Sequence, residues 1–120
     1  MSHALQNLAA AVGARVAAQT GNANATRISS VFAGNKISEL LHHGAPGTLL
    51  VTGLANHHLL RAAGLVEAPA ICLTDGIEPS PELIAAAREH GVTLLVTQLP
   101  LTEAAAALQR LVNRDDGPHA

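Results

Sequence analysis

A threefold repeat in the second half of the chain constrains its fold more than any other feature. Each copy consists of a short apolar run, a threonine, a loop and a helix-like segment, and the three runs occupy residues 48–53, 70–75 and 92–98. Apolar residues follow one another in these runs without alternating with polar ones, which indicates strands buried on both faces. Helices between such strands favour right-handed β-α-β crossovers. The repeat therefore predicts a single α/β domain with a mainly parallel sheet flanked by helices.

The helices of the repeat are bounded by residues with known preferences for helix ends. We expect helices over residues 56–63, 80–90 and 102–112. Each begins with a residue, Asn56, Ser80 or Thr102, whose side-chain oxygen can accept a hydrogen bond from an amide of the first turn. Gly64 and Gly91 are expected just past two of the helix ends, because glycine readily adopts the left-handed conformation found there.

The first half of the chain is expected to complete the same domain. Its predicted elements are a helix with Leu5, Leu8 and Val12 on one face that ends at Gly13, a strand over residues 14–17, a loop over residues 20–25, a strand over residues 28–33 and a short helix with Ile37, Leu40 and Leu41 on one face. A length of 120 residues suits one domain. We expect residues 1–112 to form it and the polar residues 113–120 to be a flexible tail.

Composition and charge exclude several classes of function. The seven lysines and arginines are scattered and Phe32 is the only aromatic residue, whereas nucleic-acid binding relies on clustered basic charge and, for single strands, on stacking aromatics. The apolar runs are too short to cross a bilayer, and the first residues lack the pattern of a signal peptide. A lone cysteine, Cys72, cannot form an internal disulfide. We therefore expect a cytoplasmic protein that binds neither nucleic acid nor membrane.

The strand ends of the repeat are the candidate binding site. Ligands of open parallel sheets bind at the carboxyl ends of the strands, and the helix starts that follow favour anions. Protonated His57 or His58 would add positive charge, so an anion held in this way should bind more weakly above about pH 7. The alternative is that these residues only cap strands and turns. The residues expected to contact a small anionic ligand are Thr52, Gly53, Asn56, His57, Thr74, Asp75, Gly76 and Thr97.

No residue pattern indicates catalysis, a metal or a cofactor. The adjacent histidine pairs, His42-His43 and His57-His58, would diverge by about 100° on a helix, whereas metal sites on helices use a spacing of three or four residues. Cys72 lies inside an apolar run, where burial raises the pKa of a thiol and makes its thiolate scarce. A nucleophile elbow is also lacking. We therefore expect a protein that is not an enzyme.

Several segments carry a family resemblance: Ser30-Val31-Phe32-Ala33-Gly34, Leu49-Leu50-Val51-Thr52-Gly53, Ile71-Cys72-Leu73-Thr74-Asp75-Gly76 with Glu78-Pro79, and His90-Gly91-Val92 with Leu95-Val96-Thr97. On these segments the stretch from Arg27 to Val112 resembles the DRTGG domain family. That family occurs in phosphate acetyltransferases, beside nucleotide-sensing CBS domains and as short standalone proteins, and it is similar to the N-terminal domain of HPr kinase/phosphorylase. A polar pair such as Asp-Arg usually follows the second segment in the family, whereas Leu54-Ala55 stands here.

The resemblance implies a regulatory, non-catalytic and often dimeric module. Independently, 48% of the residues are apolar, and a domain this small leaves apolar surface that two-fold pairing commonly covers. We expect a sensing domain that forms a homodimer and binds a small anionic metabolite or nucleotide. Two alternatives stay open: a small transferase acting on a phosphorylated substrate, and an assembly protein that binds a protein partner and no small ligand.

Overall fold

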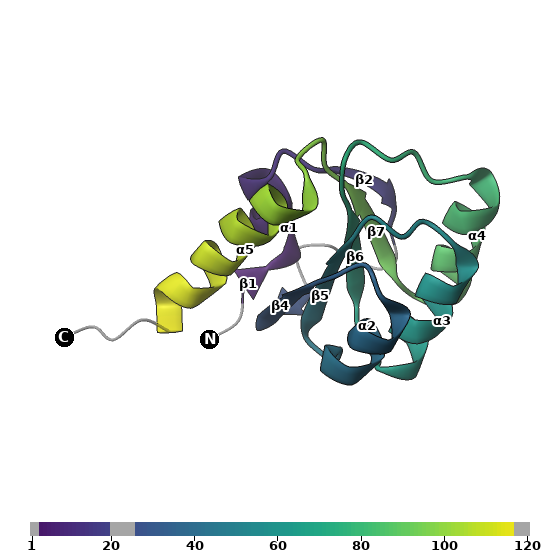
Figure 1. Ribbon diagram of the computed structural model, residues 1–120, viewed down its shortest axis with the longest axis horizontal. Helices are drawn as coiled ribbons and strands as arrows, with labels where there is room; N and C mark the ends of the chain where they lie inside the picture. Colours follow the sequence, from purple (N-terminus) through teal and green to yellow (C-terminus); the bar gives the residue numbers. More distant parts are fainter. Residues whose placement is uncertain (1–2, 20–25, 117–120) are drawn as a thin grey trace.

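A five-stranded sheet forms the centre of the computed structural model, which describes residues 3–19 and 26–116 (Figure 1). Across the sheet the strands are β2 (Arg15–Ala18), β7 (Thr93–Val96), β6 (Ala70–Leu73), β5 (Thr48–Thr52) and β4 (Ser30–Ala33). The last four are mutually parallel, and β2 pairs antiparallel with β7 at one edge. The predicted α/β fold with a mainly parallel sheet is confirmed.

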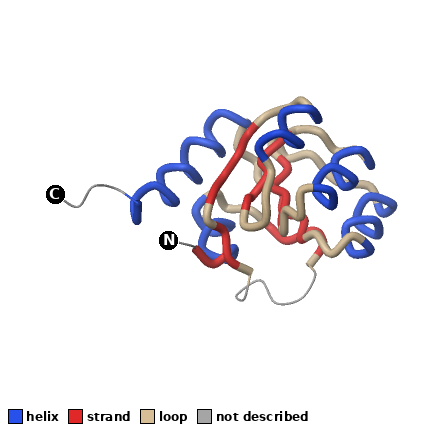
Figure 2. Tube along the Cα trace, turned by 90° about the horizontal axis from the view of Figure 1, so that it is seen from below, coloured by secondary structure: helices blue, strands red, loops and turns tan. Residues whose placement is uncertain are grey.

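The helices cover the sheet in two layers (Figures 1 and 2). One face carries α2 (Ile37–His43), α3 (His57–Leu65) and α4 (Pro81–Glu89), and the other carries α1 (Leu5–Ala11) and α5 (Leu101–Asp116). Strands β4 to β7 are neighbours in the order in which the chain visits them. Because right-handed crossovers that all step in the same direction place their helices on the same side, α2, α3 and α4 share one face.

The alternation of side chains along each strand explains why the apolar runs are continuous. Leu50 and Ile71 belong to the apolar cluster beneath α2, α3 and α4. Their strand neighbours Leu49 and Cys72 belong to the cluster beneath α1 and α5. Since successive side chains point to opposite faces of a sheet and both faces are covered here, the middle positions of these strands are apolar on both faces.

The predicted strand over residues 28–33 divides into two strands in different sheets. Arg27–Ile28 is β3, which pairs antiparallel with β1 (His3–Ala4) in a separate two-stranded sheet. The division falls at Ser29, whose amide donates to the Gly47 carbonyl over 2.8 Å instead of continuing either ladder. The predicted loop over residues 20–25 lies outside the described residues.

Two predicted helix starts and two predicted helix ends are confirmed; one of the ends is at Gly13, which follows α1 with φ 61°. The Asn56 side chain accepts a hydrogen bond from the amide of Leu59, and the Ser80 side chain accepts one from the amide of Leu83, each over 3.1 Å. Gly91 follows α4 with φ +71°, the left-handed conformation expected there.

The predicted end of α3 at Gly64 is wrong. Gly64 lies inside the helix, which continues to Leu65, and Glu67 takes the left-handed position instead with φ 61°. A glycine inside a helix costs about 1 kcal/mol relative to alanine. The helix therefore contains a residue that weakens it.

The last helix differs from the prediction at both ends. It begins at Leu101, so Thr102 is not its N-cap; the Pro100 carbonyl accepts the first helical hydrogen bond, from the Ala104 amide over 2.9 Å. It continues to Asp116, four residues beyond Val112, because the first strong helix breakers in the sequence are Gly117 and Pro118. Residues 113–116, predicted as part of the tail, are thus helical. Over residues 3–19 and 26–116, no helix is both long and apolar enough to span a bilayer.

Replacing Ile71 with aspartate should unfold the protein. Ile71 is fully buried in the central strand β6, and an unpaired buried charge costs several kcal/mol out of the roughly 5–15 kcal/mol that stabilise a native domain. Thermal unfolding followed by circular dichroism checks this, with Ala85→Asp on the exposed side of α4 as the control. An Ile71→Asp variant that melts like the wild type would contradict the strand assignment.

Candidate functional site

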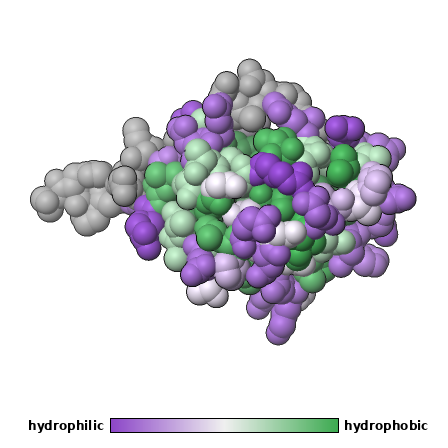
Figure 3. Space-filling view, turned by 90° about the horizontal axis from the view of Figure 1, so that it is seen from above, coloured by the Kyte–Doolittle hydropathy of each residue, from purple (hydrophilic) through white to green (hydrophobic). Residues whose placement is uncertain are grey.

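The carboxyl ends of four parallel strands meet at one edge of the sheet, and Figure 3 looks towards this edge. Apolar side chains gather near the middle of this view, with hydrophilic side chains around them. Leu54, Ile77 and Leu99, in the loops after β5, β6 and β7, are each partly buried. The edge is thus a mixed surface in which apolar loop residues lie among polar groups.

The loop after β5 is fixed by a side chain from the end of β4. Asn35 Oδ1 accepts hydrogen bonds from the Gly53 amide over 2.8 Å and from the Thr52 hydroxyl over 3.1 Å. Thr52 Oγ1 also accepts from the Leu54 amide over 3.1 Å. Sequence reasoning missed Asn35, because Gly34-Asn35 lacks the threonine that marks the other three strand ends.

The loop after β6 is turned sharply and bonded to the end of β7. Asp75 and Gly76 both have left-handed backbones, with φ 60° and 65°. The Asp75 amide donates to the Leu99 carbonyl and the Gly76 amide to the Thr97 carbonyl, each over 2.9 Å. A Cβ atom on Gly76 would lie 2.5 Å from Gln98 Oε1. The left-handed backbone therefore favours glycine at this position, whereas the exposed Gln98 side chain could move aside for a Cβ atom.

The three strand-end threonines are fully buried and bonded within the protein. The Thr97 hydroxyl donates to the Val12 carbonyl over 2.7 Å and accepts from the Leu99 amide over 3.2 Å. The Thr74 hydroxyl donates to Asp75 Oδ2 over 2.8 Å. Together with Thr52, these side chains hold the loops of the edge in fixed positions.

The predicted site residues fall into three groups in space. Gly53 adjoins Thr74, because a Cβ atom on Gly53 would lie 3.6 Å from Thr74 Oγ1. Gly76 and Thr97 are joined by the backbone hydrogen bond described above. Asn56 and His57 lie at the start of α3, where the Asn56 side chain is engaged as the N-cap and His57 is exposed. The hydrogen bonds described above join the strand ends to one another, whereas the His57 side chain is exposed at the start of α3.

Charged groups at this edge are few. Lys36 is exposed between the end of β4 and the start of α2. Arg15 forms an ion pair with Glu78, in which both side chains are at least half exposed. Such a pair contributes little to stability, but it neutralises the arginine. The charges at this edge are therefore those of Lys36, of the exposed Asp75 and of the exposed Glu39, whose Oε1 would lie 3.3 Å from a Cβ atom on Gly34.

The histidines at the end of α2 have packing partners. The His43 ring stacks on Phe32 of β4, with ring centroids 4.3 Å apart, and the His42 ring meets His43 edge-on at 4.8 Å. Among the residues that the structure describes, no group of three or more histidines, cysteines or carboxylates is close enough together to hold a metal ion.

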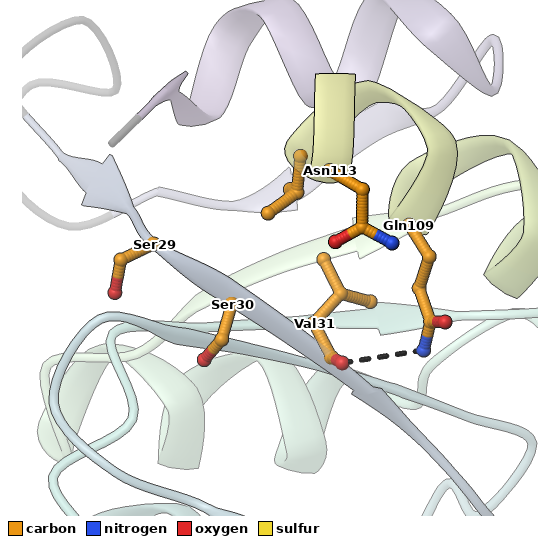
Figure 4. A pocket seen from close by; sticks show the side chains of 6 residues that line it. Ser29, Ser30, Val31, Gln109 and Asn113 are labelled. Atoms are coloured by element: carbon orange, nitrogen blue, oxygen red, sulfur yellow. Dashed lines mark hydrogen bonds between the residues drawn. The ribbon is translucent and has the colours of Figure 1, made fainter. Parts of the chain in front are cut away.

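A separate hollow of about 310 Å³ lies between β4 and α5 (Figure 4). Gln109 of α5 spans it and donates a hydrogen bond from Nε2 to the Val31 carbonyl over 3.4 Å. Its lining residues are all uncharged: Ser29, Ser30, Val31, Gln109, Val112 and Asn113. The hollow therefore offers an anion no opposite charge.

The thiol of Cys72 should resist alkylation in the native protein. Cys72 is fully buried in β6, and burial raises the pKa of its thiol from 9.0 to about 12. At pH 8 only about one thiol in ten thousand would then be ionised, and the thiolate is the reactive form. Iodoacetamide labelling read by mass spectrometry should be negligible in buffer and complete in guanidinium chloride. Rapid labelling of the folded protein would show that Cys72 is accessible.

Comparison with solved structures supports the fold. The chain superposes with a TM-score of 0.68 on the crystal structure of the CBS and DRTGG domains of the regulatory region of Clostridium perfringens pyrophosphatase, complexed with its activator diadenosine tetraphosphate. The two sequences are 16% identical, and the superposition covers 88% of this chain and 45% of that one. The chain therefore spans less than half of that regulatory region. No curated protein matches the chain in sequence.

The sequence itself matches the DRTGG domain over residues 7–111, which is most of the chain. The match includes most of α1, all five strands of the central sheet and most of α5. It agrees with the resemblance seen in the strand-end segments, and the chain belongs to the DRTGG domain family.

Proposed function

We propose that this chain is a non-catalytic regulatory module that self-associates and binds a small anionic metabolite or nucleotide at the carboxyl edge of its sheet. Family membership supports a regulatory role. The pyrophosphatase region of the same fold was solved with a nucleotide activator, which supports a nucleotide as the ligand class.

The start of α3 is the observation that carries this proposal. The amides of His57 and His58 lie in the first helical turn and have no acceptor within the helix. Both imidazole side chains are exposed beside them. The helix dipole adds partial positive charge at this end, and Lys36 follows Asn35, whose side chain is bonded to the Gly53 loop. Free amide donors and two exposed imidazole side chains therefore lie together at the start of α3.

The remaining predicted residues have distinct roles in this proposal. Thr52, Gly53, Thr74, Gly76 and Thr97 form the rigid floor of the site, since their polar groups are bonded to one another or to neighbouring loops. Asn56 and His57 face the anionic part of the ligand. The exposed carboxylate of Asp75 repels a bare anion but can accept a hydrogen bond from a ribose hydroxyl or an amine. This combination favours a nucleotide over inorganic phosphate.

One of the alternatives has an observation in its favour. An assembly protein without a small ligand would use the strand-end threonines only as structural caps, and the internal hydrogen bonds of Thr52 and Thr97 fit that role. We rank it second because it gives no role to the exposed cationic groups around the start of α3. The transferase alternative gains no specific support from the described residues.

A thermal-shift screen separates a ligand-binding module from an assembly protein. The probes are diadenosine tetraphosphate, ATP, acetyl phosphate and inorganic phosphate. A ligand that binds only the native state at about 100 times its Kd adds roughly 2.7 kcal/mol of stability, which raises the melting temperature by several degrees. We expect such a rise with a nucleotide and none with phosphate. No rise with any probe would favour the assembly protein.

Calorimetry on variants of the edge then locates the site. A His57→Ala, Thr74→Val double variant removes an imidazole beside the free amides and the hydroxyl that holds Asp75 Oδ2. We expect it to bind the nucleotide found in the screen at least roughly tenfold more weakly, a loss of about 1.4 kcal/mol. His42→Ala, in the last turn of α2, is the control. Unchanged affinity in the double variant would place the site elsewhere.

A further inference from the structure

Nothing in the fold of a single chain requires glycine at position 64. It lies inside α3, where glycine destabilises a helix, and its φ is not in the left-handed region. A Cβ atom at this position would meet only His90 Nδ1, at an ordinary contact distance of 3.6 Å. Alanine would therefore fit and would stabilise the helix. Glycine at an exposed helix position also serves the close approach of another backbone.

The residue next to Gly64 is the most exposed large apolar side chain among those described. Leu65 is 77% exposed, and Leu41 on the adjoining α2 is 38% exposed. Leu65 lies between two hollows. One, of about 200 Å³, is lined by Ile37, Leu41, His58, Arg61 and Ala62 as well as Leu65. The other, of about 510 Å³, is lined by Arg61, Gly64, Glu89 and His90 as well as Leu65. The exposed Leu65 side chain thus lies beside two hollows that it does not fill.

The charges around Leu65 are complementary to a second copy of the same surface. Arg61 and Glu89 are both exposed and line the same hollow. A two-fold interface brings one patch against itself, so a patch with one basic and one acidic side chain can pair each with its opposite in the other copy. A patch with charges of one sign would repel its copy.

We propose that the α3 face, formed by Arg61, Gly64 and Leu65 with Leu41 and Glu89 beside them, is a two-fold interface with a second copy of this chain. Leu65 of each copy enters a hollow of the other, Gly64 allows the two α3 helices to approach closely, and Arg61 pairs with Glu89 across the interface. This inference rests on the self-association in the proposed function and specifies the surface that mediates it.

Sedimentation equilibrium on the full chain tests the interface through Leu65. The wild type should dimerise at tens of micromolar, and Leu65→Glu should raise the dimer Kd at least about thirtyfold because a central apolar anchor is replaced by a charge. Val16→Glu is the matched control, since Val16 is another exposed apolar side chain, 44% exposed, on β2. Circular dichroism establishes that both variants are folded.

Two further changes test the geometry without adding charge to an apolar site. Gly64→Ala should weaken the dimer while the monomer, at high dilution, melts no lower than the wild type, because the methyl group fits within one chain. Arg61→Glu should weaken dimerisation, and the double variant Arg61→Glu, Glu89→Arg should restore it.

The outcomes separate this inference from the proposed function. A wild type that stays monomeric at hundreds of micromolar would overturn both self-association and the interface. A wild-type dimer whose Kd is unchanged by Leu65→Glu and Gly64→Ala would overturn the α3 interface and leave self-association through another surface. Loss of the dimer in Leu65→Glu and Gly64→Ala, with Val16→Glu unaffected, supports the α3 face.

Discussion

The sequential order of the parallel strands is the constraint on which the rest of this structure depends. Because β4, β5, β6 and β7 are neighbours in chain order, their crossover helices all lie on one face. The opposite face, with Leu49, Cys72 and Leu95, would be exposed unless the two ends of the chain supplied α1 and α5 to cover it. Only after β7 does the chain cross to this opposite face, so the loops after the neighbouring strands β6 and β7 leave the sheet on opposite sides. Such a divergence is the kind of switch point at which open α/β sheets bind ligands.

The backbone at the carboxyl edge of the sheet explains why threonine recurs at the strand ends. Where a buried strand ends, the next amides lose their ladder partners and need others. Thr52 and Thr97 meet this need in the same way: each hydroxyl accepts from the amide two residues later and donates to a distant segment. Thr74 instead donates to the next side chain, at a loop turned by two left-handed residues. The recurrence of threonine thus reflects repeated strand ends as much as any ligand.

Local features were predictable from the sequence, and features set by distant contacts were not. The continuous apolar runs and the caps at Asn56 and Ser80 depend only on neighbouring residues. Their patterns in the sequence therefore predict the sheet and two of the helix starts. The role of Asn35 depends on hydrogen bonds with residues 17 and 18 positions away. No local sequence pattern predicts such a distant partner. Gly64 was mistaken for a helix end because the left-handed residue is Glu67, a type that seldom adopts that conformation. The ligand contacts of the strand-end residues stay a prediction.

Helix α3 joins the two proposed surfaces. Its first turn adjoins the strand-end loops and its last turn carries Leu65, eight residues or about 12 Å along the helix. A ligand can change self-association only if it binds monomer and dimer with different affinities. The Asn35–Gly53 hydrogen bond holds the loop before α3 in place. A ligand that moves this loop would move the start of α3 with it, and a shift of α3 against α2 would displace Leu65 in the proposed interface.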